Sequence, residues 1–224
     1  EVLLPMPKRN NISMSVIRRL PRYHRFLRHL RNKGVTRISS TELSAKLGLT
    51  ASQIRQDLNC FGGFGQQGYG YLVDQLSDEI AKILGLRNEY KAILIGAGNL
   101  GQAIASHMNF TEDGFSLVGI FDNSPFKIGN RINGIEVLEM EQLEPFCERE
   151  KPVMAVLCVP REAVEELSDR LCALGIHSFW NFTHCDIVVK HPDAIVENVH
   201  LNDSLMTLCY QIQAHDEKEE EPES

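Results

Sequence analysis

The stretch KAILIGAGNLGQAIA, residues 91–105, joins a short apolar run to a glycine-rich turn and the opening of a helix. Its run AILI is typical of a strand that is buried on both faces of a parallel sheet. A GxGxxG pattern at such a place permits a tight turn, lets the backbone approach a diphosphate, and lets the helix pack closely on the strand. The N–H groups at the start of that helix attract anions. The stretch therefore predicts a dinucleotide site, and its turn residues are Gly96, Gly98, Asn99, Leu100 and Gly101.

The following segment supports this prediction. FSLVGIFD is expected to form a second strand, and it ends at Asp122, 21 residues beyond Gly101. An acidic residue at this distance binds the adenine ribose hydroxyls in dinucleotide folds. No arginine follows Asp122 directly, which favours NAD(H) over its 2′-phosphorylated form. We therefore expect NAD(H) as the cofactor.

Strand and helix patterns alternate through the rest of this region. KPVMAVLCVP and HSFWNFTHCDIVV are expected to form strands, and REAVEELSDRLCALGI forms an amphipathic helix between them that ends at Gly175. The second of these strands carries Asn181 at its C-terminal end, where open parallel sheets place their ligands. The predicted fold class is α/β, a doubly wound parallel sheet over roughly residues 90–200.

Charge is distributed unevenly along the chain. The net charge is -7, yet residues 1–60 contain 12 basic and 3 acidic residues. A basic first quarter joined to an acidic remainder indicates a module that binds a polyanion.

Cysteine spacing and hydropathy indicate the compartment. The six cysteines form no CxxC pair, and no histidine stands at zinc-finger spacing, so we expect reduced thiols and no metal site. The sequence shows no leader peptide and no apolar run near the ~20 residues that a membrane span requires. A cytoplasmic protein without a membrane partner is expected.

A helix-turn-helix is predicted in the basic part. Helices over residues 40–47 and 51–59 are each preceded by a capping-box pattern, Ser39 with Glu42 and Thr50 with Gln53. The second helix has the features of a recognition helix, whose front end enters the major groove. Side chains there that suit base edges and phosphates are Ser52, Gln53, Arg55 and Gln56.

Flanking segments complete this module. Pro21 cannot lie inside a helix, so a helix is predicted to begin there and run to Lys33, with Arg18, Arg22 and Arg25 on its cationic face. The segment FGGFGQQGYGYLV predicts a tight hairpin with aromatic packing residues, the wing of a winged helix.

The last helix is predicted over residues 201–214. It carries Leu201, Leu205, Leu208 and Ile212 on one stripe and follows the completed sheet. We expect this stripe to pack on another subunit, and the alternative is that it folds back onto its own domain. The predicted organisation is a DNA-binding domain over 1–85, a nucleotide-binding domain over 86–200, a dimerisation helix over 201–214 and a disordered acidic tail over 215–224.

These segments together resemble the Rex family of bacterial redox-sensing repressors. The motifs that carry the resemblance are RLPRYHRFL, SQIRQDL, FGGFGQQGYGY, GAGNLGQAIA, FDNSPFKIG, WNF and IVENVHL, in this order from about Pro7 to Ile212. The resemblance implies a homodimer with a swapped C-terminal helix, which binds an inverted-repeat DNA operator and is released by NADH. For the cofactor it adds Asn123, Lys127, Val159, Pro160 and Asn181 to the turn residues and Asp122. For DNA it implies Arg9, Ser52, Gln53, Arg55, Gln56, Gln66 and Gln67.

The sequence departs from the family pattern at several positions. The family's wing usually carries Lys-Arg where this chain has Gln66 and Gln67, and lost phosphate contacts weaken binding and its salt dependence. The family's sensing network joins an arginine, matching Arg25, to an aspartate and a tyrosine. These two positions hold His200 and His107, and neutral imidazole forms no salt bridge with arginine. A regulator with a weak NADH response, or none, is therefore an open alternative.

A second alternative is an NAD-dependent oxidoreductase. His177, His184 and His191 are its candidate acid–base residues, but none has a partner that the sequence identifies. A sheet domain that is complete near residue 200 leaves few residues to enclose a substrate. We therefore expect no enzyme, no catalytic residue and no small molecule that is turned over.

Overall fold

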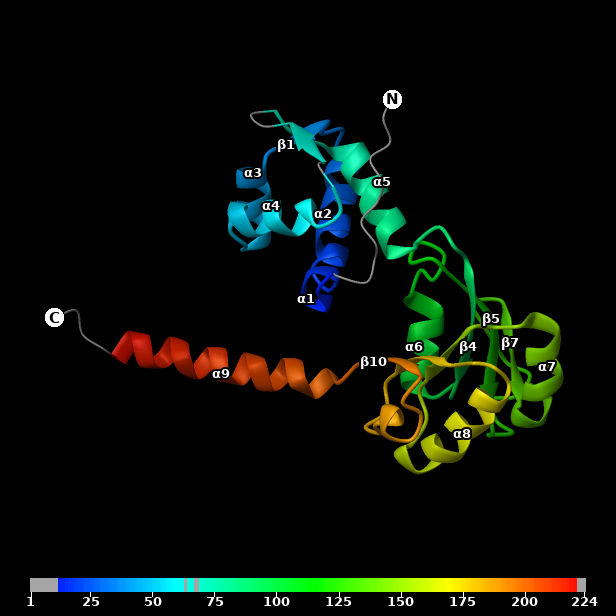
Figure 1. The fold of residues 1–224 in the computed structure, drawn as a ribbon. Coiled ribbons are helices and arrows are strands. Elements are labelled where there is room, and N and C mark those ends of the chain that lie inside the picture. Colours follow the sequence, from blue (N-terminus) through cyan, green and yellow to red (C-terminus); the bar gives the residue numbers. More distant parts are fainter. Residues whose placement is uncertain (1–11, 63, 67–68, 221–224) are drawn as a thin grey trace. The chain divides into compact units, whose positions relative to one another are not determined.

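The computed structural model describes residues 12–62, 64–66 and 69–220. The chain divides into two compact units, residues 1–88 and 89–224 (Figure 1). Each unit has its own hydrophobic core.

The N-terminal unit is built mainly from helices. They are α1 (Met14–Ile17), α2 (Leu20–Asn32), α3 (Ser40–Leu47), α4 (Ala51–Asn59) and α5 (Val73–Leu84). Pro21 lies in the first turn of α2, where its missing N–H costs no hydrogen bond. The two predicted helices of the helix-turn-helix agree with α3 and α4 at both ends.

A small antiparallel sheet accompanies these helices. Its strands β1 (Arg37–Ile38), β3 (Gly70–Leu72) and β2 (Gly65–Gln66) lie in the order β1-β3-β2. The hairpin of β2 and β3 is the predicted wing, and Tyr71 pairs with both Ile38 and Gly65. The core beneath is formed by Leu20, Tyr23, Leu27, Ile54 and Leu58, all nearly or fully inaccessible to solvent. This unit is a winged helix.

The second unit contains a seven-stranded sheet. Its strands are β4 (Tyr90–Ile95), β5 (Phe115–Asp122), β6 (Arg131–Ile132), β7 (Ile135–Glu139), β8 (Met154–Leu157), β9 (Ser178–Asn181) and β10 (Ile195–Asn198). They lie in the order β10-β9-β8-β4-β5-β7-β6, and all neighbours are parallel except β6 and β7. Without the short β6 this is the strand order of the dinucleotide-binding Rossmann fold, and the order reverses between β4 and β8.

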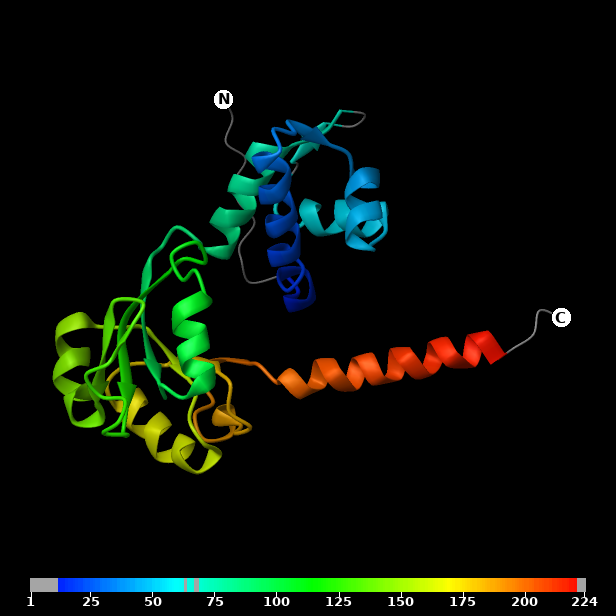
Figure 2. The same ribbon diagram turned by 180° about the vertical axis from the view of Figure 1, so that it is seen from behind.

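Helices cover both faces of this sheet. α6 (Asn99–His107) packs on one face with Ala92 and Leu94, while α7 (Leu143–Glu150) and α8 (Arg161–Ala173) pack on the other with Ile93 and Ile95 (Figures 1 and 2). Short 3-10 turns lie at Met140–Gln142 and Ile187–Val189. Alternate residues of one strand thus enter opposite cores, as the expected burial on both faces requires.

The capping prediction was correct for α3 and half correct for α4. Ser39 and Glu42 form the complete capping box. Thr50 accepts the backbone N–H of Gln53, but the Gln53 side chain turns instead to the carboxylate of Asp57. A hydrogen bond to a buried carboxylate is stronger than one to the exposed N–H at the helix start.

The predicted disordered tail over 215–224 was wrong for its first part. The last helix, α9 (Leu201–Glu220), continues through His215 to Glu220. Glutamate and lysine are good helix formers, and no glycine or proline interrupts the sequence before Pro222. Residues 221–224 lie outside the described part of the chain.

The apolar side chains of α9 are exposed. Leu201, Leu205, Leu208 and Ile212 are between 49% and 63% accessible, and Met206 and Tyr210 are 63% and 72% accessible. The fold-back alternative is therefore not observed within this chain, and the helix needs a partner for its apolar surface. No helix among the described residues is long and apolar enough to span a membrane.

Candidate nucleotide and nucleic-acid sites

The glycine turn lies between β4 and α6, at the point where the strand order reverses. Gly96 has a φ of +98°, and a Cβ there would lie 2.3 Å from the carbonyl oxygen of Cys158. A Cβ on Gly101 would lie 1.9 Å from the carbonyl oxygen of Gly96. Both positions therefore require glycine for the backbone to close on itself.

Gly98 has a different environment. A Cβ there would meet no heavy atom within 4 Å, and the backbone has ordinary L-residue angles, φ -71° and ψ -174°. Gly98 precedes α6 as its N-cap, and no side chain caps the helix start. The open space thus lies where helix N–H groups are available to an anion, which fits a bound diphosphate.

Asp122 lies at the end of β5, beside this turn. Its carboxylate accepts the N–H of Ala97 (2.7 Å), the N–H of Ser124 (2.8 Å) and the ammonium of Lys127 (3.1 Å). Burial tends to raise the pKa of Asp122, but these donors outweigh burial and lower the pKa below its usual value. Asp122 therefore remains ionised and ties the glycine turn to the end of the neighbouring strand.

A cavity of about 550 Å³ opens next to the turn. Its lining includes seven of the predicted cofactor residues, namely Gly96, Gly98, Asp122, Asn123, Lys127, Val159 and Pro160. Met140, Glu166 and Arg170 also line it and were not predicted, because nothing in the sequence places α8 beside the turn. Burial raises the pKa of Cys158, another lining residue, to about 12, so its thiol remains protonated.

The remaining predicted cofactor residues lie elsewhere. Asn99 and Leu100 are exposed in the first turn of α6, and Gly101 is buried behind it. Asn181 does not line the cavity, and its fully buried amide donates to Cys185 and Asn198 and accepts from Thr183. The structure thus gives Asn181 the role of joining β9 to β10 and to the following loop.

The predicted switch residues fall into both units. Arg25 is exposed on α2 of the first unit, and His107 is exposed at the end of α6 in the second. His200 precedes α9 and stacks on His184, with ring centroids 5.6 Å apart. A network among Arg25, His107 and His200 stays a prediction.

The candidate DNA-binding surface is the exposed side of α4. Ser52, Arg55 and Gln56 are exposed there, and Arg55 donates to the hydroxyl of Ser40 on α3 at 2.9 Å. Gln53 lies in the first turn and is partly buried. Three further predicted residues add nothing here, since Arg9 and Gln67 lie outside the described residues and the structure does not describe the side chain of Gln66.

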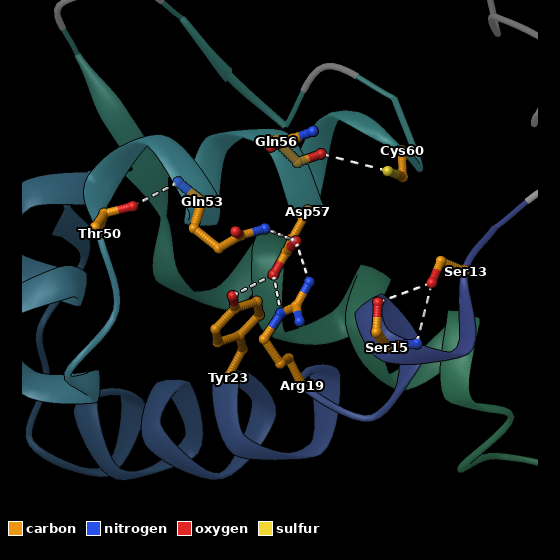
Figure 3. A network of polar contacts seen from close by, with 9 residues as sticks. All are labelled: Ser13, Ser15, Arg19, Tyr23, Thr50, Gln53, Gln56, Asp57 and Cys60. Atoms are coloured by element: carbon orange, nitrogen blue, oxygen red, sulfur yellow. Dashed lines mark hydrogen bonds and ion pairs between the residues drawn. The ribbon is translucent and has the colours of Figure 1, made fainter.

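Asp57 anchors α4 and was missed in the sequence. It is fully buried, and its carboxylate accepts two hydrogen bonds from Arg19 (2.6 and 2.7 Å), one from Tyr23 (2.6 Å) and one from Gln53 (2.8 Å) (Figure 3). Burial tends to raise the pKa of Asp57, but these donors outweigh burial and lower it below its usual value. A lone acidic residue on the apolar side of a helix in a strongly basic segment was the available signal.

We expect this network to make the N-terminal unit sensitive to acid. The lowered pKa of Asp57 stabilises the folded state above the unfolded pKa of about 3.9, and that contribution is lost as the pH falls through the folded value. Thermal unfolding followed by circular dichroism from pH 7 to 2 should show the loss below about pH 4. Asp57→Asn should have a lower melting temperature at pH 7 and a smaller change on acidification, and equal acid sensitivity of both proteins would contradict the assignment.

Taken together, the two units define a class of protein. A winged helix with a cationic exposed surface is joined to a Rossmann sheet with a dinucleotide cavity, which is the organisation of a nucleotide-responsive DNA-binding protein. Family models agree with this division. Residues 11–59 match "Putative DNA-binding protein N-terminus" and residues 87–185 match "CoA binding domain".

Curated relatives and solved structures identify the family. The redox-sensing transcriptional repressor Rex of Thermoanaerobacter pseudethanolicus is 53% identical over 92% of each chain, and Rex of Clostridium botulinum is 52% identical over 92% of this chain and 98% of its own. The crystal structure of RSP in complex with beta-NAD+ and operator DNA is 52% identical, with a TM-score of 0.84 over 93% of this chain and 95% of that one. RSP in complex with beta-NADH is 49% identical, with a TM-score of 0.84 over 93% and 98%. This chain belongs to the Rex family of redox-sensing transcriptional repressors.

Proposed function

We propose that this chain represses transcription by binding operator DNA through α4, and that NADH in the cavity beside the glycine turn releases the DNA. One observation carries the proposal most directly: the open space at Gly98 lies at an uncapped helix start in a chain that also contains a winged helix. The related RSP was crystallised with beta-NAD+ on operator DNA and with beta-NADH. NAD+ is thus expected to be compatible with DNA binding.

The residues of the cavity have distinct proposed roles. The backbone at Gly98, Asn99 and Leu100 binds the diphosphate, while Asp122 and Asn123 bind the adenosine. Lys127, whose ammonium contacts Asp122, adds positive charge at the same end. Val159 and Pro160 line the part of the cavity after β8, where the nicotinamide is expected. The nicotinamide supplies the redox signal, since its ring is cationic in NAD+ and neutral in NADH.

We also propose that the functional unit is a homodimer. An inverted-repeat operator has two-fold symmetry, which a symmetric dimer matches with one recognition helix per half-site. The exposed apolar surface of α9 supports this proposal, because a second copy of the chain would cover it.

We infer that the nucleotide is bound and not turned over. The protonated thiol of Cys158 is a poor nucleophile, and His191 lies 2.9 Å from Asp169, with neither residue in the cavity lining. NADH absorbance should therefore stay constant with a panel of small aldehydes and ketones. A DNA-bound regulator of this kind is expected in the cytoplasm.

Fluorescence anisotropy tests the proposal. The protein is titrated onto a labelled duplex that carries the RSP operator, with NADH, with NAD+ or without nucleotide, at one fixed salt concentration because phosphate contacts are salt-dependent. NADH should raise the dissociation constant about 10-fold or more over that in NAD+. If calorimetry shows that both nucleotides bind and neither changes DNA affinity, the proposed regulation is wrong and the alternative of a weakly responding regulator holds.

A further inference from the structure

The buried carboxylate of Asp57 controls the orientation of Gln53. Nε2 of Gln53 donates to Oδ1 of Asp57 at 2.8 Å, one helical turn along α4. Arg19 and Tyr23 bind the same carboxylate from α2, so its position is set by two helices (Figure 3). Gln53 is thus connected to the core of the domain although it stands in the first turn of the recognition helix.

The chemistry of the pair leaves one orientation for the Gln53 amide. An ionised carboxylate has acceptors and no donor, so the amide atom that faces Asp57 is the NH2 group and not the oxygen. Arg19 keeps the carboxylate ionised, since its guanidinium donates two hydrogen bonds to it. Among the described residues, no other hydrogen bond involves the Gln53 side chain. Its Oε1 and its second N–H therefore remain available as an adjacent acceptor and donor.

We propose that Asp57 is a positioning residue for base reading, and that it presents Gln53 to an adenine in the major groove. Adenine offers a donor at N6 and an acceptor at N7, which match an amide oxygen and an amide N–H side by side. The inference rests on the proposed DNA-binding function of α4. Base readers commonly stand at the N-terminal end of a recognition helix, and Gln53 is the third residue of α4.

Gln56 provides a matched control. It has the same side chain on the same helix, it is exposed, and no hydrogen bond joins its amide to another described residue. Its amide can rotate to present either edge. Replacing Gln56 is therefore expected to change affinity without removing the preference that Gln53 provides.

The test measures base preference at each position of the operator. The full-length protein is bound to duplexes of the RSP operator in which each half-site base pair is replaced in turn, and each adenine is also replaced by 7-deazaadenine, which lacks N7. Wild type should lose about 10-fold in affinity at one A·T pair, with a comparable loss for the 7-deaza base. Gln53→Ala should reduce this preference to less than 2-fold at that pair alone, while Gln56→Ala should keep it.

Asp57→Asn separates positioning from a structural role. Asparagine has nearly the same shape but offers both a donor and an acceptor, so Gln53 is no longer held in one orientation. The variant should lose the preference at the same pair, and adding Gln53→Ala should cause no further loss there. A merely structural Asp57 would weaken all duplexes by one factor in both backgrounds.

A second variant keeps the proposal falsifiable if Asp57→Asn unfolds. Gln53→Glu presents acceptors only, and it should shift the preference at that pair from adenine towards cytosine, whose N4 is a donor. Uniform weakening of all duplexes by Gln53→Ala would mean a phosphate contact and would overturn the inference alone. Failure of wild type to bind any operator duplex would overturn the proposed function and the inference with it.

Discussion

Replacing Gly101 with alanine should unfold the sheet domain and abolish NADH binding. A Cβ at this position would stand 1.9 Å from the carbonyl oxygen of Gly96, which is backbone and cannot rotate away. The strand and helix that form the turn must separate, and we expect a loss of about 3 kcal/mol or more in stability. Fluorescence of Trp180, the only tryptophan in the chain, reports unfolding of this domain directly.

Gly98→Ala is the matched control three residues earlier. Its Cβ enters open space on an unstrained backbone, so the melting temperature should remain close to that of wild type. NADH binding measured by calorimetry should nevertheless fall, because the methyl group occupies the space in which the diphosphate is proposed to lie. Wild-type NADH affinity in Gly98→Ala would show that no ligand approaches the backbone there, and wild-type stability in Gly101→Ala would contradict the close contact.

Introducing charge on α9 should convert the protein to monomers. Leu205 and Leu208 are 63% and 49% accessible in the single chain, so Leu205→Glu combined with Leu208→Glu should leave its folding intact. In the proposed dimer these positions are buried against the second copy, where two carboxylates without partners are strongly unfavourable. Light scattering should show a molecular mass near 25 kDa. Affinity for the inverted repeat should fall about 100-fold or more as the coupling of the two half-sites is lost.

Gln213→Glu controls for added charge on the same helix. Gln213 lies off the leucine stripe, and its amide donates to Glu217 at 3.0 Å in the exposed part of α9. This variant should remain dimeric and should bind the operator like wild type. If Leu205→Glu with Leu208→Glu also remains dimeric, the leucine stripe is not the dimer contact.

Local patterns in the sequence predicted several elements closely. The glycine turn with its flanking strand, the strand that ends at Asp122 and the two helices of the helix-turn-helix each carry their signal within about ten residues. Shorter elements gave no such signal. The hairpin of β6 and β7, the helices α5 and α7 and the edge strand β10 were not predicted, because their burial comes from neighbours far along the chain.

The sites show the same division between local and distant information. Gly96, Gly98 and Asp122 were found from spacing, since a dinucleotide turn and its acidic partner occur at characteristic separations. The contacts of Asp57 with Arg19 and Tyr23 join residues 38 and 34 positions apart, and no local pattern contains them. Asn181 was expected near the cofactor from its place at a strand end, but the loop after β9 encloses its amide.

The sequence by itself determined the two-unit organisation, the dinucleotide turn and the recognition helix. Each depends on backbone chemistry that neighbouring residues impose, such as the need for glycine at a tight turn or a hydroxyl at a helix start. Only the tertiary structure decided which side chains line the cavity, which carboxylate holds Gln53, and that the apolar surface of α9 remains exposed within one chain. Those features depend on segments distant in the sequence meeting in the folded protein, because packing acts between neighbours in space.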